Sequence, residues 1–180
     1  ILADDRIVDP QAICDAGFAL AFFGGQQQRG VSVLRRAVAL NPNSALILMT
    51  SGWAHRYVGE NSTAEELFLR AIRLNPIDPN IGLTRAGLAQ LMYQRGDYEA
   101  ATQMLERALA EQPGIYAALM GLVVACWKTG RIAEARRYAE VLRASVPDLS
   151  ISGFLQDSPV RIAAWSQDVE DAFRALGVPE

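Results

Sequence analysis

The stretch YQRGDYEAATQMLERAL (Tyr93–Leu109) decides the fold of this chain. Its Gly96 separates two runs in which apolar residues recur at helical spacing. Glycine is favoured just after a helix because it adopts the left-handed backbone conformation at little cost. Pro113, which follows the second run, stops that helix from continuing. The stretch therefore predicts one helix, a tight turn and a second helix.

The same pattern occurs four times along the 180 residues. Its glycines are separated by 34, 37 and 34 residues, and its prolines by the same three intervals. They are Gly25, Gly59, Gly96 and Gly130, with Pro42, Pro76, Pro113 and Pro147. A period of about 34 residues resembles the tetratricopeptide repeat, a unit of two helices. This resemblance covers residues 11–148 and implies pairs that stack, because no pair buries its apolar face alone.

We expect an all-α, right-handed solenoid of four helix–turn–helix repeats with a C-terminal capping helix. The expected parts are an N-terminal junction at 1–10, repeats at about 11–44, 45–78, 82–115 and 116–149, and a capping segment at 149–180. In the second repeat we expect helices at about 45–58 and 63–74. Asn61 and Ser62 are the predicted N-caps of the second of these helices.

Two repeats depart from the family pattern. The first has Phe18 where a small residue is usual, and Gly30 where alanine usually opens the second helix. The fourth has Val123 at the small position and Leu142 at a late alanine position. These departures indicate unusual packing in the first pair and an end unit that meets something different in the fourth.

The C-terminal segment carries an apolar stripe at helical spacing. The stripe consists of Ile162, Trp165, Val169, Phe173 and Leu176. Ser158 and Pro159 are the predicted start of this helix. A solenoid must cover its last apolar face, so we expect the helix to act as the cap.

Composition excludes several classes of protein. The net charge of −3, from 17 basic and 20 acidic residues, argues against a nucleic-acid partner. No apolar run approaches the roughly 20 residues that a membrane span requires. The two cysteines, Cys14 and Cys126, lie on apolar helix faces. We expect both to be buried reduced thiols, which favours a cytoplasmic location.

The sequence offers little catalytic chemistry. Its single histidine, His55, has no neighbouring cluster that would make it a metal ligand or a general base. Motifs for a phosphate loop or a nucleophile elbow are not present in the sequence. We therefore expect no catalytic, cofactor or metal site in these residues.

A groove remains as the candidate site. In the tetratricopeptide family the first helix of each pair lines the concave face, so the resemblance implies a protein or peptide partner there. Aromatic residues with arginine and methionine nearby are typical of binding patches. The candidate residues are Asp15, Phe22, Met49, Trp53, Arg56, Tyr57, Gln90, Tyr93, Gln94, Trp127 and Lys128. The alternative is that these side chains pack between helices or against the capping helix.

A narrower resemblance rests on three stretches. They are the long third linker LNPIDPN (Leu74–Asn80), the opening NPNSALILMTSGWAHRYVGE (Asn41–Glu60), and the tail from PDLSISGFLQDSP (Pro147–Pro159) to FRALGVPE (Phe173–Glu180). Together they resemble the region that follows the catalytic domain of bacterial class III adenylate cyclases. A similar region follows the DNA-binding domain of some winged-helix transcription regulators.

The cyclase resemblance implies an interaction or regulatory module in a signalling protein. Residues 1–10 would then be an internal junction of a longer chain, and another domain of that parent would be a partner. The metal-binding aspartates of such cyclases belong to a separate domain, so this chain is expected not to be an enzyme itself. A stand-alone scaffold and a homo-oligomer remain open.

Overall fold

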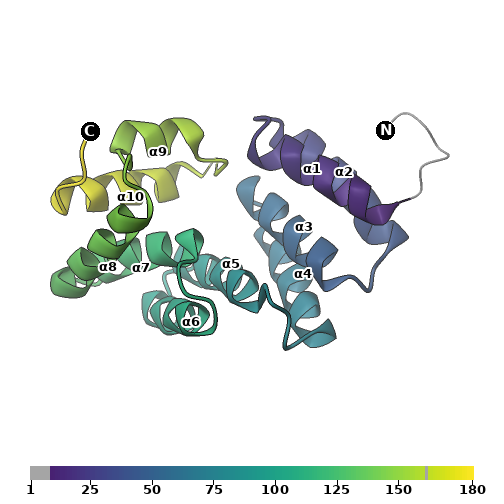
Figure 1. Ribbon diagram of the computed structural model, residues 1–180, viewed down its shortest axis with the longest axis horizontal. Coiled ribbons are helices and arrows are strands. Elements are labelled where there is room, and N and C mark those ends of the chain that lie inside the picture. Colours follow the sequence, from purple (N-terminus) through teal and green to yellow (C-terminus); the bar gives the residue numbers. More distant parts are fainter. Residues whose placement is uncertain (1–8, 161) are drawn as a thin grey trace. The chain divides into compact units, whose positions relative to one another are not determined.

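The computed structural model describes residues 9–160 and 162–180 (Figure 1). All ten regular elements in this part of the chain are α-helices. They are α1 (Pro10–Phe22), α2 (Gln27–Leu40), α3 (Ala45–Tyr57), α4 (Asn61–Leu74), α5 (Ile81–Gln94), α6 (Tyr98–Glu111), α7 (Tyr116–Lys128), α8 (Ile132–Ser145), α9 (Ile151–Asp157) and α10 (Ala163–Ala175). Residues 1–8 of the expected junction lie outside the described part.

The chain divides into two compact units, with the boundary between Asp78 and Pro79. In the N-terminal unit α1 packs on α2, α3 packs on α4, and α3 also contacts both helices of the first pair. In the C-terminal unit α5 packs on α6, α7 packs on α8, and α7 also contacts both helices of the preceding pair. The prediction of an all-α chain built from successive helix pairs is confirmed.

The four repeat glycines make the turns within the pairs. Their φ angles are 61° at Gly25, 80° at Gly59, 85° at Gly96 and 76° at Gly130. This is the left-handed region, which side chains with a Cβ rarely adopt. The predicted role of these glycines at the ends of the first helices is therefore confirmed.

The second helix of the second pair begins two residues earlier than expected. Helix α4 starts at Asn61, and Glu60 stands at the N-cap without a side-chain capping bond. The prediction of Asn61 and Ser62 as N-caps is therefore wrong. The Glu60 carboxylate instead accepts a hydrogen bond of 2.6 Å from Arg35 on α2. This contact holds the residue before the helix in place and ties the second pair to the first.

The C-terminal segment contains one helix more than expected. Ser150 caps the short helix α9, where its side chain accepts a hydrogen bond from the Gly153 amide. Ser158 follows the end of α9, and α10 begins only at Ala163. The prediction that Ser158 and Pro159 start the last helix is therefore wrong, because these residues belong to the connection between α9 and α10.

The first pair packs more closely than its sequence pattern indicates. A Cβ added to Gly30 would lie 2.6 Å from the Ala21 Cβ and 2.7 Å from the carbonyl oxygen of Gly17. Contacts this short with backbone require the helices to move apart. The small residue of α1 at this crossing is thus Gly17, while Phe18 is half-buried and stacks on Phe22 at 5.2 Å.

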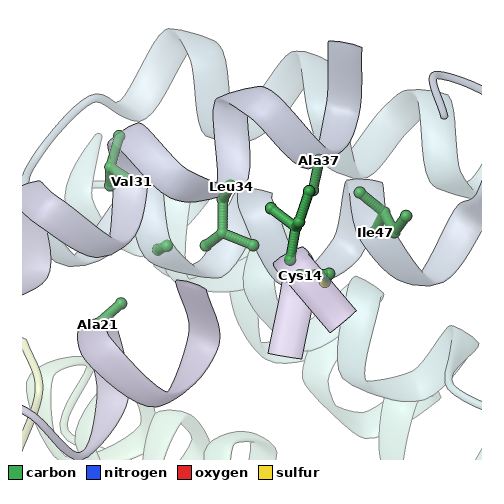
Figure 2. Packing of buried hydrophobic residues seen from close by; sticks show 8 residues of the cluster. Cys14, Ala21, Val31, Leu34, Ala37 and Ile47 are labelled. Atoms are coloured by element: carbon green, nitrogen blue, oxygen red, sulfur yellow. The ribbon is translucent and has the colours of Figure 1, made fainter. Parts of the chain in front are cut away.

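One buried hydrophobic cluster, which forms part of the core of the N-terminal unit, joins the first helix pair to α3 (Figure 2). It consists of Ile13, Cys14, Ala21, Val31, Leu34, Ala37, Ile47 and Ala54. Cys14 is buried here, and Cys126 is buried in α7 of the C-terminal unit. Both are free thiols, as predicted, and burial raises the pKa of each to about 11.

Candidate functional site

The candidate groove residues of the N-terminal unit are mostly packed inside it. On α1, Asp15 is exposed and accepts a hydrogen bond of 2.8 Å from Gln11, and Phe22 is half-buried. On α3 the candidate side chains are buried. They are Met49, Trp53, Arg56 and Tyr57. The structure thus places these four side chains in the interior rather than on an open surface.

Aromatic rings run through this unit from α1 to α4. Phe22 lies 5.9 Å from Tyr57, Tyr57 lies 6.0 Å from Trp53, and Trp53 packs its ring against Phe68 at 5.8 Å. The Arg56 guanidinium lies 5.6 Å from the Trp53 ring centre, a cation–π distance. Burial lowers the pKa of Arg56 to about 10, so the side chain stays charged at neutral pH. Shape and ring packing therefore account for the aromatic pattern in this unit.

His55 is buried on the same helix. Its Nδ1 lies 2.7 Å from the carbonyl oxygen of Ser51, so this nitrogen carries the proton and donates. Its Nε2 faces the Glu60 carboxylate at 3.7 Å, and that carboxylate already binds Arg35. Desolvation by burial lowers the pKa of His55 below its usual value of 6.5. The ring is therefore neutral at pH 7.

We expect this neutral ring to make folding sensitive to acid. Because the pKa of His55 is lowered in the folded state, its protonation costs more there than in the unfolded chain. The contribution of His55 to the free energy of unfolding should be complete above pH 6.5 and should be lost as the pH drops below that value. The total loss is about 1.4 kcal/mol for each unit by which folding lowers the pKa of His55. Urea unfolding at pH 7.5 and pH 5 should show a larger loss in the wild type than in His55→Gln. Equal losses would contradict this assignment.

In the C-terminal unit, Tyr93 and Lys128 meet at one carboxylate. The Tyr93 hydroxyl donates to Oδ2 of Asp168 at 2.8 Å, and the Lys128 ammonium donates to Oδ1 at 2.6 Å. These three residues, from α5, α7 and α10, are called the Asp168 latch below. The hydrogen bond to Asp168 raises the pKa of Lys128. Burial, followed by the same carboxylate, raises the pKa of Tyr93.

An aromatic contact lies beside the latch. The ring of Trp165, on α10, meets the ring of Tyr93 edge-on at 5.3 Å. Trp165 is buried, as are Val169, Ala172 and Phe173 on the same face of α10. The predicted stripe is confirmed at Trp165, Val169 and Phe173, whereas Ile162 and Leu176 are only half-buried.

Helix α10 packs against α7 and α9. The Phe154 and Phe173 rings lie 5.9 Å apart, and the Ile151 amide donates to the carbonyl oxygen of Pro179 at 2.8 Å. The helix thus covers α7, as a cap should, and also reaches Tyr93 on α5. The groove residues were expected either to line an open binding surface or to pack between helices or against the capping helix. Tyr93 and Lys128 follow the second expectation, because both contact α10.

The remaining candidates of this unit are Gln90, Gln94 and Trp127. Gln90 is buried and donates to the carbonyl oxygen of Ala117 at 2.9 Å, which joins α5 to α7. Gln94 and Trp127 are half-buried, and the Lys128 ammonium lies 6.0 Å from the Trp127 ring centre. Sequence reasoning missed Asp168, the residue that brings Tyr93 and Lys128 together.

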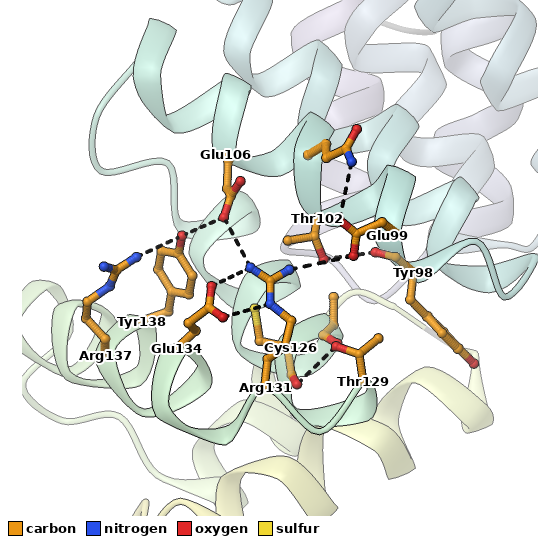
Figure 3. Close-up of polar contacts among 12 residues, drawn as sticks. Tyr98, Glu99, Thr102, Glu106, Cys126, Thr129, Arg131, Glu134, Arg137 and Tyr138 are labelled. Atoms are coloured by element: carbon orange, nitrogen blue, oxygen red, sulfur yellow. Dashed lines mark hydrogen bonds and ion pairs between the residues drawn. The ribbon is translucent and has the colours of Figure 1, made fainter.

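A separate ionic cluster joins α6 to the start of α8 (Figure 3). Arg131 forms ion pairs with Glu134, Glu99 and Glu106, the last two at 3.8 Å. Tyr138 donates to Glu106 at 3.1 Å. The bond to Glu134 raises the pKa of Arg131, and Arg131 lowers the pKa of Glu134. This network is partly exposed to solvent and holds the third pair against the fourth.

Two further findings concern residues 9–160 and 162–180. No group of three or more His, Cys, Asp or Glu side chains there is placed to hold a metal ion. None of the helices described is both long enough and apolar enough to cross a membrane.

Residues 92–153 match the tetratricopeptide repeat family. No curated protein sequence matches the chain. Among solved structures, Pseudomonas aeruginosa pilF is similar with a TM-score of 0.62 and 18% identity over 95% of this chain and 79% of that chain. A mutant of MamA is similar with a TM-score of 0.60 and 17% identity over 97% and 98%. A further MamA crystal structure has a TM-score of 0.59 and 22% identity over 80% and 81%.

These likenesses bear on the fold. At such low identity the structural matches carry no function with them. The family match, over residues 92–153, lies entirely within the C-terminal unit. Together with the helix pairs and their glycine turns, they show an all-α array of the tetratricopeptide type.

Proposed function

We propose that this chain is a non-catalytic module that binds a helical segment of another protein on the face formed by α5 and α7. One observation carries the proposal: this face already holds an amphipathic helix, α10, through an aromatic contact and a carboxylate bound by Tyr93 and Lys128. Arrays of helix pairs offer such faces as binding surfaces. Aromatic rings beside a cation are typical of residues that dominate binding energy.

The parent protein is proposed from sequence resemblance alone. The linker at Leu74–Asn80 and the tail after Pro147 favour a bacterial adenylate cyclase-like signalling protein in the cytoplasm. A winged-helix transcription regulator is the alternative parent. Sequence upstream of Ile1 would distinguish them, because a cyclase domain carries two metal-binding aspartates and a regulator carries a basic recognition helix.

The first partner to test is the neighbouring domain of the parent, supplied as a separate chain. Trp127 is a half-buried aromatic residue whose ring lies near the Lys128 ammonium, so Trp127→Ala should weaken binding by about 2 kcal/mol, roughly 30-fold. Arg36 and Arg137 are exposed on second helices, and their replacement by alanine should change binding by about 0–1 kcal/mol. Isothermal titration calorimetry measures all three. The groove assignment fails if the two arginine variants lose binding while Trp127→Ala retains it.

A further inference from the structure

Helix α10 presents a defined pair of side chains to the face of α5 and α7. Trp165 and Asp168 are three residues apart, so they lie on the same side of the helix. Trp165 meets the Tyr93 ring, and Asp168 takes one hydrogen bond from Tyr93 and one from Lys128. Both donors point at a single carboxylate, so the face matches an acidic group next to an aromatic one.

The polar part of this contact is the part that is open to water. The side chains of Lys128 and Asp168 are 35% and 18% exposed, whereas Trp165 is 4% exposed. A competing helix therefore has direct access to the Lys128 ammonium while the apolar stripe is still in place. If it brings its own aromatic residue and carboxylate, the apolar face of α7 is covered again after the exchange.

Covalent connection favours α10 over any free helix. A short connection between Asp157 and Ala163 joins α10 to α9, so the local concentration of α10 at the face is high. The apparent affinity for an external helix is proportional to the fraction of molecules in which the face is free, so it is low when α10 occupies the face. Weakening only the contact made by α10 should therefore increase the apparent affinity for a helix supplied from outside.

We infer that α10 is the chain's own inhibitory ligand, and that it competes with an amphipathic helix of a partner protein that carries an aromatic residue followed three positions later by a carboxylate. This inference rests on the proposed function, since it specifies the partner and the regulation of that same face. The Asp168 latch sets the balance between the closed and the partner-bound forms.

The test uses the full 180-residue chain and a fluorescently labelled peptide of residues 158–180. Anisotropy titrations compare the wild type with Asp168→Asn, which removes the charge from the latch but keeps the shape of the side chain. A hydrogen bond between charged groups supports an expected gain of about tenfold or more in affinity for the peptide. Glu170→Gln is the matched control, because Glu170 pairs with Arg174 on α10 and not with Lys128. This variant should bind the peptide as the wild type does.

Two further arms make the result specific. A peptide with Asp168→Asn should bind the Asp168→Asn chain about tenfold more weakly than the wild-type peptide does. The Lys128→Met chain should show no gain in peptide affinity over the wild type, because the internal and the external helix both lose the same cation. Circular dichroism establishes that each variant is folded, and hydrogen exchange reports how firmly α10 is held.

The outcomes separate the two proposals. A gain confined to Asp168→Asn supports both. Equal peptide affinity in the wild type, Asp168→Asn and Glu170→Gln would leave the binding face standing but overturn the inhibitory role of the latch. If hydrogen exchange shows α10 loosened in Asp168→Asn and the peptide still fails to bind, the face does not accept a helix from outside, and both proposals are overturned.

Discussion

Removal of the residues after Ser158 is expected to lower the melting temperature severely or to cause aggregation. The truncation deletes Trp165 and Phe173, which are 4% and 0% exposed. Burying such a side chain contributes about 3–5 kcal/mol. Two of them approach the typical total stability of a domain, about 5–15 kcal/mol. The loss also uncovers α7, whose surface is strongly apolar where α10 packs.

Scanning calorimetry and size-exclusion chromatography check this expectation. The control is Arg174→Ala, which changes an exposed residue of α10 that pairs with Glu170 and Glu180. An exposed ion pair contributes about 0–1 kcal/mol, so this variant should melt close to the wild type. A truncated chain with an unchanged melting temperature and a monodisperse profile would show that α10 contributes nothing to the fold.

Replacement of Phe68 by alanine is expected to destabilise the N-terminal unit by about 3–5 kcal/mol. The Phe68 side chain is fully buried, packs on Trp53 and fills the space beside Gly52, where an added Cβ would lie 2.7 Å from its ring. The alanine variant therefore leaves a cavity between α3 and α4. The adjacent Leu69 is 40% exposed, so Leu69→Ala should cost far less.

Urea denaturation followed by circular dichroism compares these two variants. Near-equal losses of stability in Phe68→Ala and Leu69→Ala would contradict the assignment of Phe68 to the core.

The parts of the fold that were predictable from sequence depend on local rules. Gly59 and Gly96 mark turns because the left-handed conformation is a property of the residue itself, and the apolar periodicity marks the helices. The start of α4 was misplaced because capping preference was used to locate it. In each pair the second helix instead begins two residues after the turn glycine, without a side-chain capping bond.

The candidate site was predictable only in part. Repeat register identifies the face on which Tyr93 and Lys128 lie, but it does not say whether another segment covers that face. Nothing in the sequence singled out Asp168 as a contact residue, because the tail contains several acidic residues. Its partner Lys128 also lies 40 residues away along the chain. For Trp53, register predicts the helix face but not the ring contacts that bury it among Tyr57 and Phe68.

The glycine crossing of α1 and α2 has a consequence for protein engineering. Substitutions toward a family's consensus residue commonly stabilise a protein. At position 30 the family's usual alanine would place its Cβ 2.6 Å from that of Ala21, so the consensus choice would separate the helices instead. A designer who averages the repeats of this chain must therefore treat the first pair as a distinct building block with its own spacing.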